Sequence, residues 1–255
     1  YRRQLGLVQQ RTSCCAQRAC GPSGPGLCSL FGLPSSLVPN STRCAVGGPL
    51  GVGAALAEIF EMQYCEGLES GWGLSGEEMV ELLSLLEVPF HEAGANEVSA
   101  RNLGSDLLAG VLQAVAAAQD APAPSVVLYF GHDTNLQYLR RMLRLTWLSE
   151  GWWPNVVEPG GQLVFEVYDE EVGRAEERFT VRILKVAATP EQQRRGLPLN
   201  SSAPPSVVPL WVPGCDGAFC PLARLLSIGR AALRPSCLEP ALAGSPASDS
   251  AANLP

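Results

Sequence analysis

A short apolar run at residues 125–130, followed at once by polar residues, constrains this chain more than any other feature. The run reads Ser-Val-Val-Leu-Tyr-Phe and lies between Pro124 and Gly131. A continuous apolar run of this length is typical of a strand buried on both faces of a sheet. Leucines then recur at helical spacing from Leu136 to Leu143. The sequence therefore predicts a buried strand that leads directly into a helix.

The rest of the chain alternates between helical and strand patterns. Residues 52–66 and residues 103–115 carry apolar side chains at helical spacing, and in the first of these segments the expected apolar face consists of Leu56, Ile59, Phe60 and Met62. Ser75 and Glu78 have the form of a capping box before a third helix, which Pro89 is expected to end. Residues 163–167 and 179–183 alternate as two strands of an antiparallel pair. We predict an α/β fold with a central mixed sheet flanked by helices and a C-terminal antiparallel hairpin.

The chain divides into three segments by composition. Residues 1–50 are rich in Cys, Gly and Pro and are expected to be loop-rich, residues 51–240 form the main folded unit, and residues 241–255 are expected to be a disordered tail. The first residue is Tyr1 rather than Met, and no signal-peptide pattern follows it. We interpret the chain as a fragment or a processed product.

Charge and hydropathy exclude two classes of partner. The formal net charge is −7, and the arginine pairs do not form a clustered basic face, which a nucleic-acid binder would usually show. No apolar stretch approaches the length of a bilayer span without a break. We therefore expect neither a nucleic acid nor a membrane as partner.

The cysteine content points to an oxidising compartment. Nine cysteines are many for 255 residues, and this number is typical of a secreted, periplasmic or lumenal protein. A zinc site is the alternative, but no CxxC pair repeats and neither histidine lies near the cysteines. We expect no metal and no cofactor.

Chemistry is expected where the predicted strand 125–130 meets the helix. Free N–H groups and the positive end of the helix dipole favour an anion such as phosphate at this position. A protonated His132 can hold a phosphoryl oxygen, and Asp133 can protonate a leaving alkoxide. The alternative is structural: Asp133 or Thr134 caps the helix, and His132 is a turn residue.

The run Gly-His-Asp-Thr-Asn-Leu at residues 131–136 resembles the C-terminal signature of the histidine acid phosphatases, the family that contains bacterial periplasmic phytases and glucose-1-phosphatases. Further segments are similar to the same family. They are residues 54–60, continuing through 63–67 to 71–73, the run Pro-Gly-Gly-Gln-Leu-Val-Phe-Glu at 159–166, and the C-terminal residues 198–200 and 214–220. The resemblance covers most of residues 20–240 and implies an incomplete, phosphoglycerate-mutase-like histidine phosphatase fold.

The resemblance implies a two-step hydrolysis of a phosphomonoester. In the family, a histidine of an N-terminal RHGxRxP motif attacks phosphorus to form a phosphohistidine, and the Asp of the HD pair protonates the leaving oxygen. Carried over, His132 holds phosphate and Asp133 is the proton donor, while Glu58, Thr134 and Asn135 are substrate-binding candidates. A solvated helix carboxylate is the alternative for Glu58. The implied partner is a small phosphorylated substrate, such as an inositol phosphate or a sugar phosphate.

The family also implies disulfides. Cys215 is expected to pair with Cys220, Cys28 with Cys20 or Cys15, and Cys237 is expected to lack a partner in this chain.

One departure from the family is large. RHGxRxP occurs nowhere in the 255 residues, and the only other histidine, His91, lacks flanking arginines and is expected to be a surface loop residue. The leading hypothesis is a phosphomonoesterase chain without its nucleophile, inactive by itself. A non-catalytic phosphatase-like protein that binds an anionic ligand is the alternative. A Cys-rich secreted interaction module is a third, which the α/β pattern disfavours.

Overall fold

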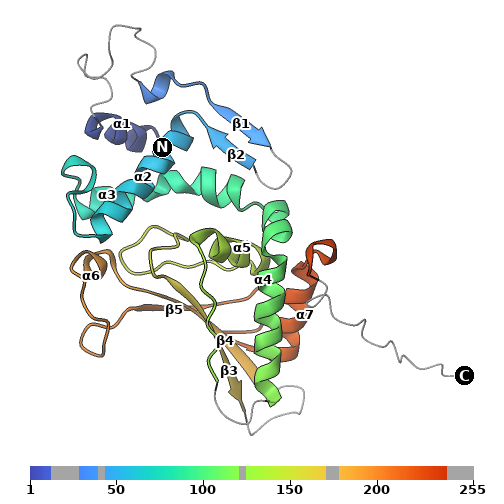
Figure 1. Cartoon of the computed structure of the whole chain (residues 1–255). Coiled ribbons are helices and arrows are strands. Elements are labelled where there is room, and N and C mark those ends of the chain that lie inside the picture. Colours follow the sequence, from blue (N-terminus) through green and yellow to red (C-terminus); the bar gives the residue numbers. More distant parts are fainter. Residues whose placement is uncertain (13–28, 40–43, 121–124, 171–177, 240–255) are drawn as a thin grey trace, which may run out of the picture.

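The computed structural model describes residues 1–12, 29–39, 44–120, 125–170 and 178–239. Two groups of elements stack on each other in Figure 1: helices and a small hairpin from the N-terminal part lie above, and a sheet with helices α4, α5, α6 and α7 lies below. The predicted α/β class is confirmed, and every strand pair among the described residues is antiparallel. The expected disordered tail, 241–255, lies outside the described residues.

The upper group surrounds helix α2. Its helices are α1 (Arg2–Arg11), α2 (Pro49–Cys65), α3 (Gly76–Leu82) and the short helical turns η1 (Leu30–Gly32), η2 (Ser70–Trp72) and η3 (Leu83–Leu86), and its strands are β1 (Ser36–Pro39) and β2 (Cys44–Gly47). Pro49 occupies the first turn of α2 directly after Gly48, which has a φ of 76°. Proline is well suited to a first helical turn, and glycine tolerates positive φ. A core that includes Val8, Phe60, Met79 and Leu85 joins these elements.

The lower group is a four-stranded sheet with helices packed against it. Its elements are α4 (Glu97–Ala117), η5 (Ala118–Asp120), α5 (Asp133–Leu143), β3 (Gln162–Asp169), β4 (Phe179–Ala187), α6 (Pro190–Arg194), β5 (Ser206–Leu210), β6 (Phe219–Pro221), α7 (Leu222–Ala232) and η7 (Pro235–Cys237). Strand β4 pairs with β3, β5 and β6. The predicted antiparallel pair is therefore confirmed as β3 and β4, in which Phe165 is opposite Ile183. Helices α4, α5 and α7 share one core with the sheet.

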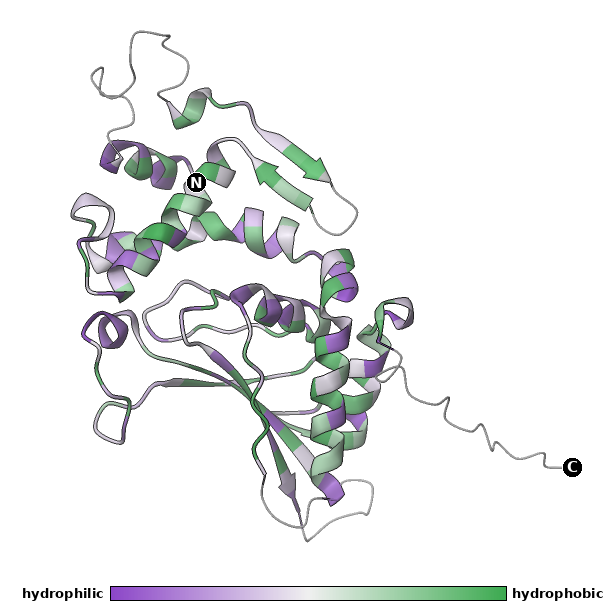
Figure 2. Cartoon of the chain, in the orientation of Figure 1, coloured by the Kyte–Doolittle hydropathy of each residue, from purple (hydrophilic) through white to green (hydrophobic). Residues whose placement is uncertain are grey.

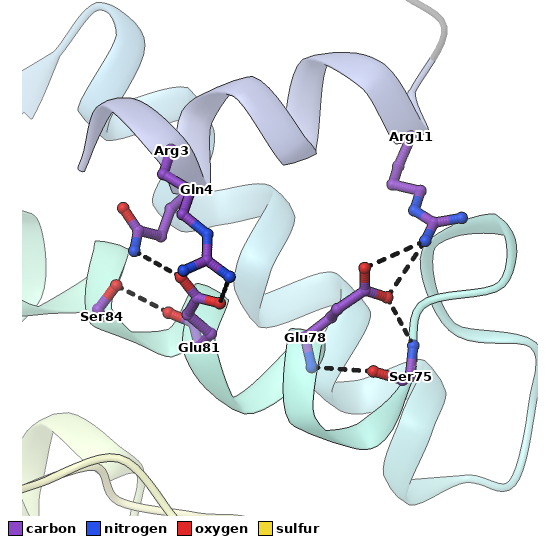
Figure 3. Close-up of polar contacts among 7 residues, drawn as sticks. All are labelled: Arg3, Gln4, Arg11, Ser75, Glu78, Glu81 and Ser84. Atoms are coloured by element: carbon purple, nitrogen blue, oxygen red, sulfur yellow. Dashed lines mark hydrogen bonds and ion pairs between the residues drawn. The ribbon is translucent and has the colours of Figure 1, made fainter.

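Polar side-chain contacts connect α1 to α3 (Figure 3). Arg3 and Gln4 both contact Glu81, and the Arg11 guanidinium pairs with Glu78 at 3.1 Å. Glu78 also completes the predicted capping box, because its carboxylate accepts from the Ser75 backbone N–H while the Ser75 hydroxyl accepts from the Glu78 N–H. The predicted start of this helix is confirmed.

Pro89 does not end the helical run, contrary to the prediction. A π-helix, η4 (Glu87–Gly94), continues through it after the 3-10 turn η3. Proline removes one N–H donor, and the wider π-helical turn accommodates that loss. His91 lies in this π-helix and is 5% exposed, so its assignment to a surface loop is wrong.

Residues 125–130 form no strand, which corrects the central expectation from the sequence. The segment carries no ladder with any described strand, and Val126, Leu128 and Phe130 are 83%, 71% and 93% exposed. Hydrophobic colouring runs along the trace that leads into α5 in Figure 2. The apolar sequence suits a buried strand, but a strand needs a neighbour to satisfy its backbone, and the described residues offer none.

Helix α2 also turns a different face inward from the one expected. Ile59 and Met62 are 49% and 51% exposed, whereas Glu61 is buried with Phe60 and Tyr64. Ala54 and Ala57 are fully buried, and a Cβ on Gly53 of the same helix would lie 2.5 Å from a side-chain carbon of Leu5 on α1.

One predicted disulfide is present. Cys215 and Cys220 are bonded, with their Cα atoms 5.2 Å apart. Cys237 is bonded to none of the described cysteines. Cys15, Cys20 and Cys28 lie outside the described residues. Among the described helices, none is both long enough and apolar enough to cross a membrane.

Candidate active site

Helix α5 begins at the predicted site, and its first turn is closed by its own side chains. His132 is the N-cap, and its backbone N–H donates to Asn135 Oδ1 at 2.8 Å. The Asn135 N–H in turn donates to the His132 carbonyl at 3.0 Å. A Cβ at Gly131 would lie 2.8 Å from Asn135 Oδ1, so glycine leaves room for this cap. The structural part of the sequence prediction, a helix starting within this motif, is confirmed.

Asp133 occupies the first position of α5 and faces solvent with His132. Its Oδ1 accepts from the Thr134 backbone N–H at 2.7 Å. A carboxylate at a helix N-terminus is favoured by the orphan N–H groups and the dipole. This contact orients the Asp133 carboxyl group at the start of the helix.

Contacts along α5 hold this first turn in place. Arg141 donates to the backbone carbonyls of His91 and Ala95 at 2.9 and 3.1 Å and pairs with Glu92. Gln137 donates to the Asn155 carbonyl at 2.7 Å. The helix that carries His132 and Asp133 is therefore attached to both η4 and the loop after α5.

Glu58 on α2 lies close enough to Asp133 for an electrostatic interaction between the two carboxyl groups. Its pKa is raised, first by partial burial and then by the negative charge of Asp133. Glu58 also lies on the rim of an open groove of about 360 Å³, which α2 and the following turn line with Ile59, Met62, Gln63, Glu66 and Leu68. Carboxyl groups of two different helices, α2 and α5, are thus within electrostatic reach of each other.

A buried charged cluster adjoins this site, and the sequence analysis did not identify it. Lys185 of β4 and Glu158 form an ion pair in which both side chains are 0% exposed. Glu61, which is 4% exposed, is near enough to Glu158, Glu58 and Asp133 for their charges to raise its pKa together with burial. The signal in the sequence was a lone Lys within the apolar run at 183–188, and a Glu three residues after Glu58 on one helix.

His91 does not have the properties expected of a catalytic nucleophile. Burial, assisted by the charges of Arg140 and Arg141, lowers its pKa to about 4. Arg140 is itself buried and lies over the Trp147 ring. His91 is therefore a neutral, buried imidazole near neutral pH.

Comparison with known proteins shows which family this chain resembles. The profile of the histidine phosphatase superfamily (branch 2) matches residues 77–185. Phytase AppA of Escherichia coli (strain K12) is 31% identical over 225 residues, which are 82% of this chain and 51% of that protein. Glucose-1-phosphatase of Salmonella typhimurium is 29% identical over 204 residues, 76% of this chain and 48% of that protein. The chain thus spans about half the length of these relatives.

Solved structures of a phytase superpose on this chain and show the same fold. Hafnia alvei phytase in complex with tartrate superposes with a TM-score of 0.77 at 26% identity, covering 94% of this chain and 61% of that one. The same phytase in complex with myo-inositol hexakis sulphate gives 0.76, at the same identity and coverage. In both sequence and fold, this chain resembles the histidine acid phosphatases of branch 2 of the histidine phosphatase superfamily.

Proposed function

We propose that this chain supplies the proton-donating part of a phosphomonoesterase that works through a phosphohistidine. The placement of Asp133 carries the proposal: an exposed carboxyl at the first position of α5, fixed by the Thr134 N–H and adjacent to His132. A helix N-terminus attracts the phosphoryl group, and a carboxylic acid there can protonate the leaving oxygen. The relatives are a phytase and a glucose-1-phosphatase, both of which act on phosphate esters by name.

Each site residue has a role in this proposal. His132, when protonated, holds a phosphoryl oxygen, and Asp133 gives its proton to the leaving alkoxide. Asn135 keeps the first turn of α5 closed, and Thr134 orients the Asp133 carboxylate through its backbone N–H. Glu58 faces the substrate, and its electrostatic interaction with Asp133 raises the pKa of Glu58. The substrate class is a small phosphomonoester, such as an inositol phosphate or a sugar phosphate.

The nucleophile is the part that these residues do not supply. The sequence contains no RHGxRxP, and neither histidine has the flanking arginines of that motif. We therefore propose that the 255-residue chain has no appreciable phosphatase activity by itself. The Cys215–Cys220 disulfide supports an oxidising compartment, secreted or periplasmic, as the place of action.

A non-catalytic protein that binds an anion is the second candidate. The same missing motif favours it, because the start of α5 is an anion site whether or not a nucleophile is present. The two candidates differ in what happens when a nucleophile is supplied.

The test is a fusion in which the part of E. coli phytase AppA that this chain does not match precedes Tyr1. Hydrolysis of an aryl phosphate at acidic pH is measured for the fusion and for the 255-residue chain. We expect turnover by the fusion and none by the chain. Robust turnover by the chain, lost on changing His132 or His91, would overturn the assignment of the nucleophile. A folded fusion that inorganic phosphate stabilises against thermal unfolding, but that does not hydrolyse the aryl phosphate, would favour the second candidate.

A further inference from the structure

The buried cluster beside the site has an unbalanced charge. Lys185 and Glu158 neutralise each other, and Lys185 also lies 5.7 Å from the centre of the Trp147 ring. Glu61 is buried next to this pair and has no cation of its own among the described residues. An isolated buried carboxylate is strongly disfavoured, so such a group takes up a proton instead of staying ionised.

Two oxygen atoms in the cluster lack hydrogen-bond partners within the described residues. They are Glu61 Oε1 and Glu158 Oε1, both fully buried. Two carboxylates offer acceptors alone, whereas a protonated carboxyl group also offers one O–H donor. Without a proton, the cluster contains two acceptors that lack a donor. A single proton on Glu61 turns one of these two carboxylates into a hydrogen-bond donor and leaves the other as an acceptor.

The backbone at Gly161 packs directly against the Lys185–Glu158 ion pair. A Cβ at Gly161 would lie 2.7 Å from both Glu158 Oε2 and Lys185 Nζ. Glycine at 161 thus lets the chain before β3 cover the ion pair directly, and it leaves no room there for another side chain.

We propose that Glu61 is a proton-binding site beside the buried Lys185–Glu158 ion pair, and that it holds one proton across the neutral pH range. This proposal concerns the chain itself and does not depend on the phosphatase proposal. The proton belongs to the folded state, because in the unfolded chain Glu61 is an ordinary carboxyl group in water.

The surrounding charges favour holding the proton. The charged or titratable side chains around Glu61 are Glu58 and Cys65 on α2, Asp133 on α5, Glu158 before β3 and Lys185 on β4. Arg194 and Glu191 of α6 interact with Tyr64, one turn further along α2. The other charged pairs near α2 join α1 to α3 (Figure 3). Burial first, and then the charges of Glu158, Glu58 and Asp133, raise the pKa of Glu61 to about 8.

Stability should therefore decline as pH rises. A carboxyl group whose pKa is raised from 4.5 to about 8 on folding contributes stability that is complete below 4.5 and is lost as pH rises towards 8. His91 acts in the opposite direction between about 4 and 6.5, because burial lowers its pKa. The two effects overlap in acid, so the effect of Glu61 is isolated between pH 6.5 and 8.

The experiment is urea unfolding of the full chain across that window, for the wild type, Glu61→Gln and Glu66→Gln. The unfolding constant of the wild type should rise by up to about tenfold per pH unit, the limit for one proton. Glu61→Gln keeps the shape and a donor but cannot ionise, so this rise should disappear. Glu66→Gln removes a carboxyl from the same helix end at the surface and should keep it. Equal pH slopes for all three proteins would overturn the proposal.

Infrared spectroscopy gives an independent measurement on the folded chain, which holds even if Glu61→Gln folds poorly. The wild type should show the carbonyl stretch of one protonated carboxylic acid at pH 7, and this band should fade as pH rises through about 8. Absence of the band at pH 7 would overturn the proposal. A second result would also overturn the proposal: a loss of stability when choline replaces sodium or potassium at constant ionic strength. A metal cation would then balance the charge of Glu61.

Discussion

At the scale of single residues, the chemistry of this chain rests on whether Asp133 donates a proton. In the fusion that supplies a nucleophile, Asp133→Asn keeps the shape of the side chain and its acceptor for the Thr134 N–H, but it removes the acid. Turnover of an alkyl phosphate should fall by about 10²–10⁴-fold, the usual contribution of general acid catalysis. An aryl phosphate with a nitrophenolate leaving group should lose much less, because that leaving group needs no proton.

Steady-state kinetics with both substrates check this prediction at the residue scale. Asp216→Asn is the matched control, since Asp216 is exposed and lies far along the chain, next to the Cys215–Cys220 disulfide. It should change neither rate. Equal losses for good and poor leaving groups on Asp133→Asn would assign the carboxylate a role in binding or capping instead.

Sequence reasoning at this scale located the motif but missed the buried charges. The start of α5 at His132 and Asp133 was predictable because a capping cluster and a helix pattern coincide there, whereas the catalytic roles of these residues stay a prediction. The burial of Glu61 was not predictable, because the more apolar Ile59 and Met62 on the same helix appeared to define its buried face. Charged residues are seldom fully buried unless paired, so the pattern gave no reason to place Glu61 inside.

At the scale of elements, the position of α5 depends on its close packing against α4. A Cβ on Gly104 would lie 2.8 Å from the Tyr138 Cβ and 3.2 Å from the Met142 sulfur. Gly104→Ala gains up to about 1 kcal/mol of helix propensity, but it forces the helices apart, and overpacking typically costs about 1–3 kcal/mol. We expect a net loss of about 1 kcal/mol in the free energy of unfolding.

Gly110 of the same helix is the matched control for that substitution. A Cβ there would meet the Tyr129 hydroxyl at 3.6 Å, an ordinary contact. Gly110→Ala should therefore stabilise the chain by up to about 1 kcal/mol through propensity alone. Urea denaturation of both variants is the measurement, and effects of the same sign would contradict tight packing between α4 and α5.

Helices and the β3–β4 pair were predictable at the element scale because their signals are local. The Ser75–Glu78 capping box and the period-2 alternation of residues 163–167 and 179–183 each specify their own element. Residues 125–130 show the limit of this reasoning, since a strand also needs a partner from elsewhere in the chain. The π-helix through Pro89 shows a second limit, because wide helical turns have no comparable sequence signature.

At the scale of the whole molecule, the exposed segment 125–130 governs how the chain behaves in solution. Its backbone groups have no strand partner among the described residues, and its side chains are apolar and largely exposed, Phe130 the most at 93%. Such a segment is a template for strand pairing between copies. The chain should therefore self-associate at micromolar to millimolar concentrations.

Light scattering over a concentration series tests this last prediction on the 255-residue chain and on two double variants. Val126→Lys with Leu128→Lys should reduce the association, because like charges at neighbouring positions oppose pairing between copies. Val98→Lys with Leu148→Lys removes two apolar side chains of similar exposure, 63% and 62%, from outside that segment and should leave the association unchanged. The fusion with the unmatched part of phytase AppA should remain monomeric if that part covers the segment. Equal association of both double variants would show that general surface hydrophobicity, rather than an unpaired strand, holds the copies together.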